Sequence, residues 1–250
     1  MIDLHCHYLP GVDDGARTMS EALALAAASV ANGITTAVLT PHVHPGILDN
    51  SLSSLRPVFA LFQAALREAE IPLAVHLGAE GRLHPGLFDL LAADELPLLG
   101  HLDGQSILLL EFPDGHIPVG ALSACRILAD RGIRPMIAHP ERNKAIIREP
   151  SQIQSFVDIG CLLQVTAASV VGRFGPHAMR TADRLLAQGL VTIIATDAHN
   201  LAHRPPLLRE AREFIRQRYG DRLAYRLTEY NAAAIITRSA TDEGTLTCTS

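Results

Sequence analysis

The chain has 250 residues, of which 48% are hydrophobic and 19% charged, so one core can bury roughly 70 to 75% of its unfolded surface. Its formal net charge of -5 argues against nucleic-acid binding through a broad basic surface. Apolar runs all fall short of the ~20 residues of a membrane helix, and residues 1–10 lack a signal-peptide pattern, which predicts a cytoplasmic location without membrane insertion.

Short β-branched or leucine-rich runs alternate with helical patterns along the chain. The first helix is well bounded, because Thr18 and Glu21 form a T-x-x-E capping box and Gly33 supplies a C-terminal stop. We expect strands at residues 1–4, 35–39, 72–77, 106–110, 134–138, 161–165 and 191–195, and helices at residues 18–32, 54–70, 121–131, 175–188 and 206–218.

Alternating strands and helices indicate an α/β fold with a parallel sheet, and nearly continuous apolar strands indicate that both sheet faces are covered. At this length a closed or nearly closed barrel is favoured, with a doubly wound open sheet as the alternative. A glycine-rich phosphate-binding turn after a strand is missing, which favours the barrel. We expect a single domain over residues 1–236 and a polar tail over residues 237–250.

The four cysteines lie far apart and lack the paired C-x-x-C spacing of a metal or redox site, so we predict free thiols at Cys6, Cys125, Cys161 and Cys248. The segment from Cys125 to Arg131 does match the C-x5-R pattern of cysteine-dependent phosphatases. That chemistry needs a loop of small residues around the phosphate, whereas the intervening residues here are typical of a helix. A cysteine nucleophile is therefore not favoured.

Histidines and carboxylates follow six of the seven expected strands. The carboxyl ends of parallel barrel strands share one rim, which is where such enzymes place their sites. Each residue alone has an ordinary explanation, such as a hydrogen-bonded loop histidine or a helix cap, but a metal cluster explains them all together. The residues are His5, His7, His42, Glu80, Glu111, His139, Asp197 and His199.

Several motifs resemble the polymerase and histidinol phosphatase superfamily: HCH at 5–7, PH at 41–42, HPER at 139–142 and TDAH at 196–199. This resemblance implies a distorted seven-stranded (β/α) barrel of the TIM type. The longer strings HCHYLPGVDDGA, LLLEFP, AHPERN and TDAHNLAHRPP are most similar to the bacterial manganese-dependent tyrosine phosphatases of capsule and exopolysaccharide operons. Residues 81–104 match no pattern of that branch, which leaves the substrate preference open.

The resemblance implies three divalent metal ions, most simply manganese, with iron or zinc also compatible with nitrogen and oxygen ligands. The first would be held by His5, His7, Glu80 and Asp197; the second by Glu80 as a bridge with Glu111 and His139; and the third by Asp14, His42 and His199. Asp14 and Glu80 would thereby take part in catalysis.

The implied activity is hydrolysis of phosphotyrosine by a metal-activated water, with Arg142 and Arg204 binding the phosphate. The implied substrate is a bacterial tyrosine autokinase that controls polysaccharide export. Flanking residues that would support ligands or donate a proton are Asp13, His44 and His203, whereas we expect His76, His84, His101, His116 and His177 to be structural or exposed.

Two alternatives stay open. The first alternative to a tyrosine phosphatase is a histidinol phosphatase or other small-molecule phosphomonoesterase of the same superfamily. The second is a noncatalytic regulatory partner that kept the barrel. A complete set of ligand residues argues against the second alternative. A metal-dependent nuclease is less favoured because the sequence lacks a basic groove.

Overall fold

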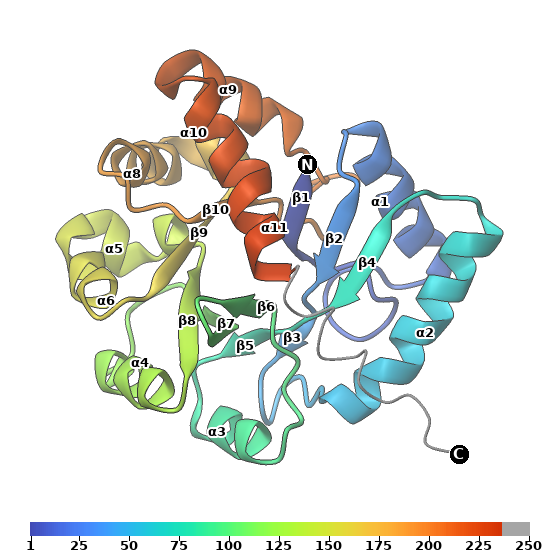
Figure 1. Cartoon of the computed structure of the whole chain (residues 1–250), viewed down its shortest axis with the longest axis horizontal. Helices are drawn as coiled ribbons and strands as arrows, with labels where there is room; N and C mark the ends of the chain where they lie inside the picture. The colour runs from blue at the N-terminus through green and yellow to red at the C-terminus, as the bar shows by residue number, and fades with distance from the viewer. Residues whose placement is uncertain (237–250) are drawn as a thin grey trace.

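The computed structural model describes residues 1–236, and the polar tail predicted at 237–250 lies outside them. Mainly parallel strands form the centre of the molecule and helices surround them (Figure 1). All seven strands predicted from the sequence are present, with their ends shifted by a few residues. The strands are β1 (Ile2–Cys6), β2 (Thr36–Leu39), β3 (His42–Val43), β4 (Ala74–Leu77), β5 (Glu80–Arg82), β6 (Gly100–Leu102), β7 (Gln105–Glu111), β8 (Ile133–Ala138), β9 (Leu162–Thr166) and β10 (Ile193–Ala195).

Two sheets share the strands, one in the order β1-β2-β4 and the other in the order β10-β9-β8-β7-β5-β3, with β6 antiparallel to β7. In the chain, β3 directly follows β2 and β5 directly follows β4. At each of these two junctions the chain passes from the first sheet to the second. On the other side, the Asp197 amide donates to the His5 carbonyl at 2.7 Å and thereby joins the end of β10 to β1. The strands thus follow one another around a ring, which confirms the predicted distorted α/β barrel.

The change of sheet between β4 and β5 depends on a glycine. A Cβ atom on Gly78 would lie 2.9 Å from Cγ1 of Val38, closer than side chains pack. The Gly78 amide still donates to the Leu39 carbonyl at 2.8 Å, and the Glu80 amide donates to the Pro41 carbonyl at 3.1 Å. The chain therefore stays paired through the bend, which fixes the start of β5 at the rim.

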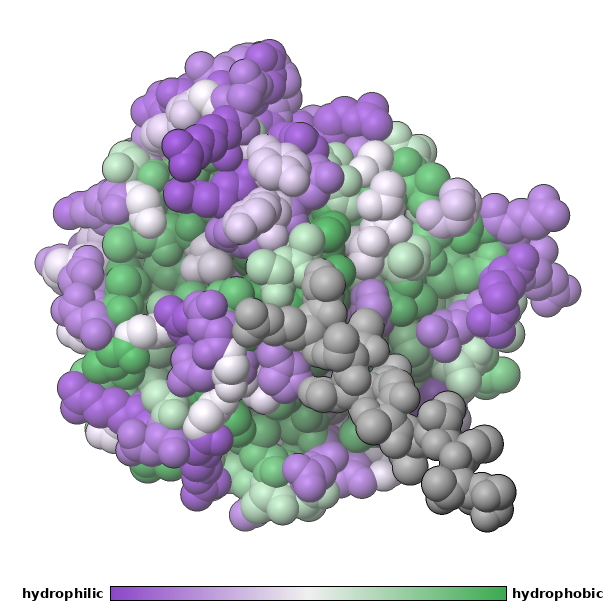
Figure 2. Space-filling view, viewed as in Figure 1, coloured by the Kyte–Doolittle hydropathy of each residue, from purple (hydrophilic) through white to green (hydrophobic). Residues whose placement is uncertain are grey.

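The five predicted helices are present, and shorter helices that were not predicted fill the connections. Hydrophilic side chains cover the region of α9 and α10 at the top of the view (Figure 2). The predicted helices are α1 (Met19–Ala31), α2 (Leu52–Glu68), α4 (Ala121–Asp130), α8 (Gly175–Ala187) and α9 (Arg209–Tyr219). The others are α3 (Pro85–Ala92), α5 (Lys144–Arg148), α6 (Gln154–Asp158), α7 (Ala167–Val170), α10 (Asp221–Tyr225) and α11 (Asn231–Ile236), with short turns η1 (Pro140–Arg142), η2 (Pro150–Ile153) and the π-helical η3 (Arg226–Tyr230).

The capping box predicted at the start of α1 forms only in part. The Thr18 hydroxyl accepts a hydrogen bond from the Glu21 amide at 3.2 Å, as predicted. The Glu21 carboxylate, however, accepts from the Arg17 amide at 2.9 Å and from the Arg17 guanidinium at 2.6 Å, one residue before the predicted partner. The guanidinium attracts the carboxylate to Arg17, which a box motif alone does not reveal. Gly33 ends the helix with φ +89°, as predicted.

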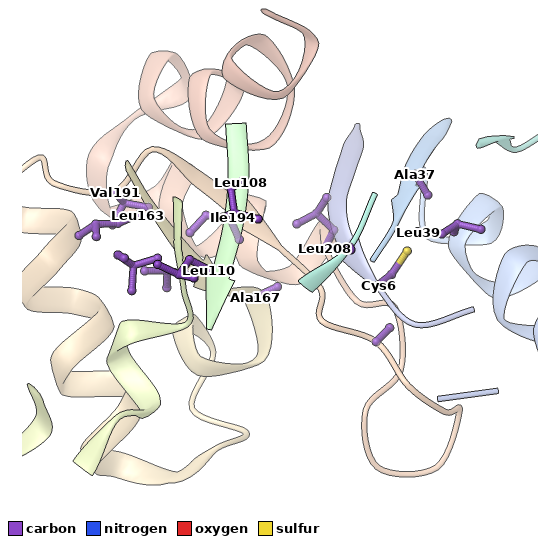
Figure 3. Packing of buried hydrophobic residues seen from close by; sticks show 14 of the residues in the cluster. Cys6, Ala37, Leu39, Leu108, Leu110, Leu163, Ala167, Val191, Ile194 and Leu208 are labelled. Carbon is purple, nitrogen blue, oxygen red and sulfur yellow. The ribbon is translucent and has the colours of Figure 1, made fainter. Parts of the chain in front are cut away.

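Two apolar clusters occupy the two faces of the strands. Leu108, Leu110, Leu163 and Ile194 belong to the outer cluster, which packs against the surrounding helices (Figure 3). The inner cluster contains Leu4, Ile107, Leu109 and Met136, together with Ala232 and Ile235 of α11. Helix α11 therefore covers one end of the barrel interior, and the opposite end, where the strands finish, is left for polar side chains.

Cys125, the cysteine of the C-x5-R match, lacks the environment of a nucleophile. Cys6, Cys125 and Cys161 are buried free thiols among residues 1–236, and Cys248 lies outside the described residues. A hydrogen bond with Cys161 and burial raise the pKa of the Cys125 thiol, which disfavours the thiolate that a nucleophile needs. Within residues 1–236, every helix is too short or too polar to cross a bilayer.

Helix α2 offers a test of the outer core. Phe62 is fully buried, whereas its neighbour Leu61 is 64% exposed. We expect Phe62→Ala to lower the free energy of unfolding by about 3–5 kcal/mol, because it leaves a cavity. Leu61→Ala should change it by less than about 0.5 kcal/mol. Urea unfolding followed by circular dichroism measures both, and equal losses would contradict this packing.

Candidate metal centre

The structure brings all nine sequence-predicted ligand residues together at the carboxyl ends of the strands. The donor atoms of eight of them form three overlapping groups, and within each group the atoms lie within 4.8 Å of one another; His139 lies beside these groups. The groups are His5, His7, Glu80 and Asp197; His7, Asp14, His42 and His199; and His42, Glu80 and Glu111. The first group has the four members predicted for the first metal.

The other two groups differ from the predicted sets in one histidine each. His7 joins the predicted trio of Asp14, His42 and His199. In the group of Glu80 and Glu111, His42 takes the place expected for His139, although each of the two histidines has a nitrogen 3.9 Å from an oxygen of Glu111. Nε2 of His139 is nevertheless 2.8 Å from Oε1 of Glu80, so this imidazole lies at the edge of the same cluster.

Glu80 lies at the centre of the cluster and is fully buried. Its Oε2 is 3.2 Å from Nε2 of His5 and 3.0 Å from Nδ1 of His42, and its Oε1 faces His139. Burial would raise the pKa of this carboxyl, but the nearby charges of His5 and His42 hold it well below its usual range. Glu80 is therefore a carboxylate that depends on positive charge around it.

Gln164 of β9 fixes the proton on His5. Its side-chain oxygen accepts a hydrogen bond from the backbone amide of His139 at 3.1 Å, and a backbone amide can only donate. The same oxygen lies 3.0 Å from Nδ1 of His5, so Nδ1 carries the proton. Nε2 of His5 is consequently the nitrogen that faces Glu80 at 3.2 Å and Asp197 at 3.3 Å.

Two further imidazoles are held in the same way. Nδ1 of His7 donates to Oδ2 of Asp13 at 2.7 Å, and that oxygen also accepts from the His42 amide at 3.1 Å. Nδ1 of His199 donates to the carbonyl of Asp197 at 3.0 Å. Each directs its Nε2 into the cluster, which is the arrangement of histidines whose outer nitrogen is held by an oxygen and whose inner nitrogen binds a metal.

The glycine after the two aspartates permits this arrangement around His7. A Cβ atom on Gly15 would lie 2.2 Å from the carbonyl oxygen of His7, so any other residue would displace the loop. The Gly15 amide also donates to Oδ1 of Asp13 at 3.0 Å. Gly15 thus lets the loop approach β1 closely enough for Asp13 to reach His7.

The cluster fits divalent cations. Oε2 of Glu80 and Nε2 of His199 are buried and make no well-aligned hydrogen bond within residues 1–236. Burial and the charge of Arg142 lower the pKa of His139 to about 4, and burial and the charge of His7 lower that of His199 to about 4, so both are neutral at pH 7. Imidazoles beside buried carboxylates are the donor set of manganese, iron or zinc.

Asp197 connects the cluster to the two predicted phosphate-binding arginines. Its Oδ1 is 3.3 Å from Nε2 of His5, and its Oδ2 accepts hydrogen bonds from both Arg142 and Arg204, the latter at 2.5 Å. The Arg142 guanidinium also lies over the ring of Phe174, 4.9 Å from its centroid. Both arginines therefore lie at the edge of the donor cluster, where the sequence placed them.

The backbone of His139 and Asp197 is in the left-handed region, with φ +33° and +53°. Such a conformation is uncommon for residues other than glycine. The Gln164 oxygen holds the His139 amide, and the His5 carbonyl holds the Asp197 amide. Neighbouring strands thus stabilise the turn that directs each side chain into the cluster.

Sequence reasoning missed three supporting residues, of which Gln164 and Glu141 are buried and Arg82 is half-buried. Gln164 is a polar residue inside an apolar strand, which was a signal that could have been used. Arg82 places its Nε 2.8 Å from Oε2 of Glu111 and so balances that carboxylate. Glu141 accepts hydrogen bonds from the Thr166 amide at 3.0 Å and the Ser169 hydroxyl at 2.7 Å, which orders the turn before Arg142.

The other histidines lie outside the three donor groups. Of the predicted supporting residues, Asp13 contacts His7, whereas His44 lies beside His84 with ring centroids 6.3 Å apart and His203 is exposed. His84 accepts from the Gly86 amide at the start of α3. The remaining ones are exposed except for His101, which is half-buried: His76, His101, His116 and His177.

Known proteins resemble this chain over most of its length. Tyrosine-protein phosphatase YwqE of Bacillus subtilis is 35% identical over 229 residues, which span 92% of this chain and 89% of that protein. Tyrosine-protein phosphatase CpsB of Streptococcus pneumoniae is 29% identical over 241 residues, or 94% of this chain and 98% of that protein. Both similarities therefore include the whole barrel.

Solved structures agree with the sequence relatives. A crystal structure from work on YwqE and CpsB, described as unique metal-dependent tyrosine phosphatases, matches with a TM-score of 0.87 and 34% identity over 94% of both chains. Organophosphorus hydrolase from Deinococcus radiodurans matches with a TM-score of 0.56 at 14% identity, covering 94% of this chain and 92% of that one, which shows the fold alone. Residues 1–237 match the family model for capsular polysaccharide synthesis, CpsB/CapC. The chain therefore belongs to the CpsB/CapC family, the branch whose motifs it was predicted to share.

Proposed function

We propose that the chain is a metal-dependent protein-tyrosine phosphatase. The observation that carries this proposal is the buried cluster of imidazoles and carboxylates with Arg142 and Arg204 at its edge. Relatives that match over nine-tenths of the chain are tyrosine phosphatases, which supports the same reaction here.

Three divalent ions, most simply manganese, would be held by the residues predicted from the sequence. These are His5, His7, Glu80 and Asp197 for the first, Glu80, Glu111 and His139 for the second, and Asp14, His42 and His199 for the third, with His7 and His42 placed to be shared. When bound, such ions activate water and neutralise charge on phosphoryl oxygens. Glu80, which belongs to two of the sets, would keep neighbouring ions together.

The chain's own cations would orient the phosphate. Arg142 and Arg204 each present a planar guanidinium that matches two phosphate oxygens. Asp197 holds both groups near the cluster, and the ring of Phe174 supports Arg142 from one side. Since a tyrosine phenolate is a good leaving group, the reaction needs little help from a protein acid.

The physiological setting belongs to the same proposal. The family's link to capsular polysaccharide synthesis supports a phosphorylated bacterial tyrosine kinase as the substrate protein. The proposal also includes a cytoplasmic location and a single catalytic domain over residues 1–236. Buried free thiols suit a reducing compartment.

Purified protein loaded with manganese should release phosphate from phosphotyrosine peptides. We expect its kcat/KM to exceed that on histidinol phosphate by about 100-fold or more, a difference of about 2.7 kcal/mol in transition-state binding. Dialysis against a chelator should abolish the activity, and added manganese should restore it. Faster turnover of histidinol phosphate would favour a small-molecule phosphatase, and inactivity on every phosphomonoester would favour a noncatalytic partner.

Ligand substitutions should separate chemistry from folding. We expect His139→Ala and Asp197→Asn each to lower kcat on phosphotyrosine peptides by more than about 100-fold, because each removes a donor from the cluster. His177→Ala, at an exposed position on α8, is the matched control and should retain full activity. Circular dichroism checks that the barrel persists, and an unchanged rate in either ligand variant would reject its assignment.

Gln164→Leu should lower manganese affinity by about 10- to 100-fold, since it removes the acceptor that orients His5 and His139. Isothermal titration calorimetry measures this without turnover. Gln152→Leu, at an exposed position, is the control and should bind manganese as the parent protein does. Equal affinity in all three proteins would show that Gln164 has no positioning role.

A further inference from the structure

A cavity of about 450 Å³ lies between α1 and the loop that follows β10. Asp14 and His199 form one end of it, and both belong to the donor group that also contains His7 and His42. The cavity therefore opens directly from the metal centre. A group bonded to a phosphate at that centre would have this space next to it.

The walls of the cavity are largely apolar. Ala24 and Leu25 line it from α1, and Leu201 and Ala202 line it from the loop. Leu201 is a large hydrophobic residue that remains 50% exposed, although it lies beside a strongly polar cluster. An apolar wall next to a charged centre suits a flat ring that carries a charged group at one end.

Hydrogen bonds hold the loop that carries Leu201 and Ala202. The side-chain oxygen of Asn200 accepts from the amide of His203 at 2.8 Å and from that of Arg204 at 3.4 Å. The His199 amide donates to the Arg204 carbonyl at 3.0 Å. One short loop thus fixes the wall of the cavity and the guanidinium at the metal centre relative to each other.

A second apolar groove, of about 370 Å³, lies between α3 and α4 and includes Phe88 and Val119. Its lining contains none of the residues of the three donor groups. A ring placed there could not be bonded to a phosphate at the metal centre without a long connection. The cavity beside α1 is therefore the better candidate for the ester group.

We propose that the cavity beside α1 binds the aromatic ring of the phosphotyrosine whose phosphate lies at the metal centre. This inference rests on the proposed phosphatase function and adds a specificity site to it. Leu201 and Leu25 contact the ring faces, and Ala24 and Ala202 leave the room that the ring occupies. Selection of an aromatic ester over an aliphatic one then follows from burial of the ring.

Two phosphonates that are not hydrolysed test this site: benzylphosphonate, which has a ring, and methylphosphonate, which has none. Calorimetry on manganese-loaded protein should show that Leu201→Ala weakens benzylphosphonate binding about tenfold, as expected for loss of one apolar side-chain contact. Ala202→Trp, which fills the cavity, should weaken it further. Neither variant should change the Kd of methylphosphonate. Val119→Ala in the second groove is the control and should bind both compounds as the parent protein does.

The outcomes separate this inference from the proposed function. If the parent protein fails to hydrolyse phosphotyrosine peptides, the proposed function is wrong whatever the phosphonates show. If the parent is active but Leu201→Ala and Ala202→Trp leave benzylphosphonate binding unchanged, or weaken both compounds equally, the ring does not lie in this cavity. Selective loss in Val119→Ala would place the ring in the second groove and also overturn the proposal.

Discussion

The structure depends on keeping the carboxylate of Glu80 charged in a position without access to water. A buried carboxylate is strongly destabilising unless positive charge lies close to it. Imidazoles from β1, β3 and the turn after β8 surround Glu80, and the charges of His5 and His42 keep its pKa well below the usual range. The barrel rim therefore requires positive charge, and the proposed cations would stabilise the fold by supplying it.

The same requirement explains the supporting residues. A histidine that offers Nε2 to a cation must carry its proton on Nδ1, and an oxygen acceptor on the outer side ensures this. Gln164 does so for His5 and Asp13 does so for His7. The strained backbone at His139 and Asp197 has the same origin, because only those turns direct both side chains inward from strand ends.

Most of the fold, and most of the residues that meet at its rim, could be predicted because local patterns mark the strands and the residues that follow them. Apolar runs mark the strands, and a polar residue such as Glu80 directly after a run marks the rim. The change of sheet at Gly78 could not be predicted, because it depends on the distance to Val38 in another strand. A polar Gln164 inside an apolar strand is a signal of a special role, but its partners could not be predicted, since they lie 159 and 25 residues away. The donor groups could not be predicted in detail either, because the pairing of β3 with β5 places His42 beside Glu80.

Likeness of fold alone does not determine the chemistry. Hydrolases that share this barrel at 12–15% identity, such as dihydropyrimidinase from Brevibacillus agri and an organophosphorus hydrolase, are described by different substrates. The barrel supplies a rim where ligands meet, and the loops decide which bond lies over it. In this chain one loop carries His199, Leu201 and Arg204, so the proposed metal donor, apolar wall and phosphate-binding cation have a fixed spacing. A change in the length of that loop would move all three residues together. It would therefore alter both the preferred ester group and the binding of its phosphate.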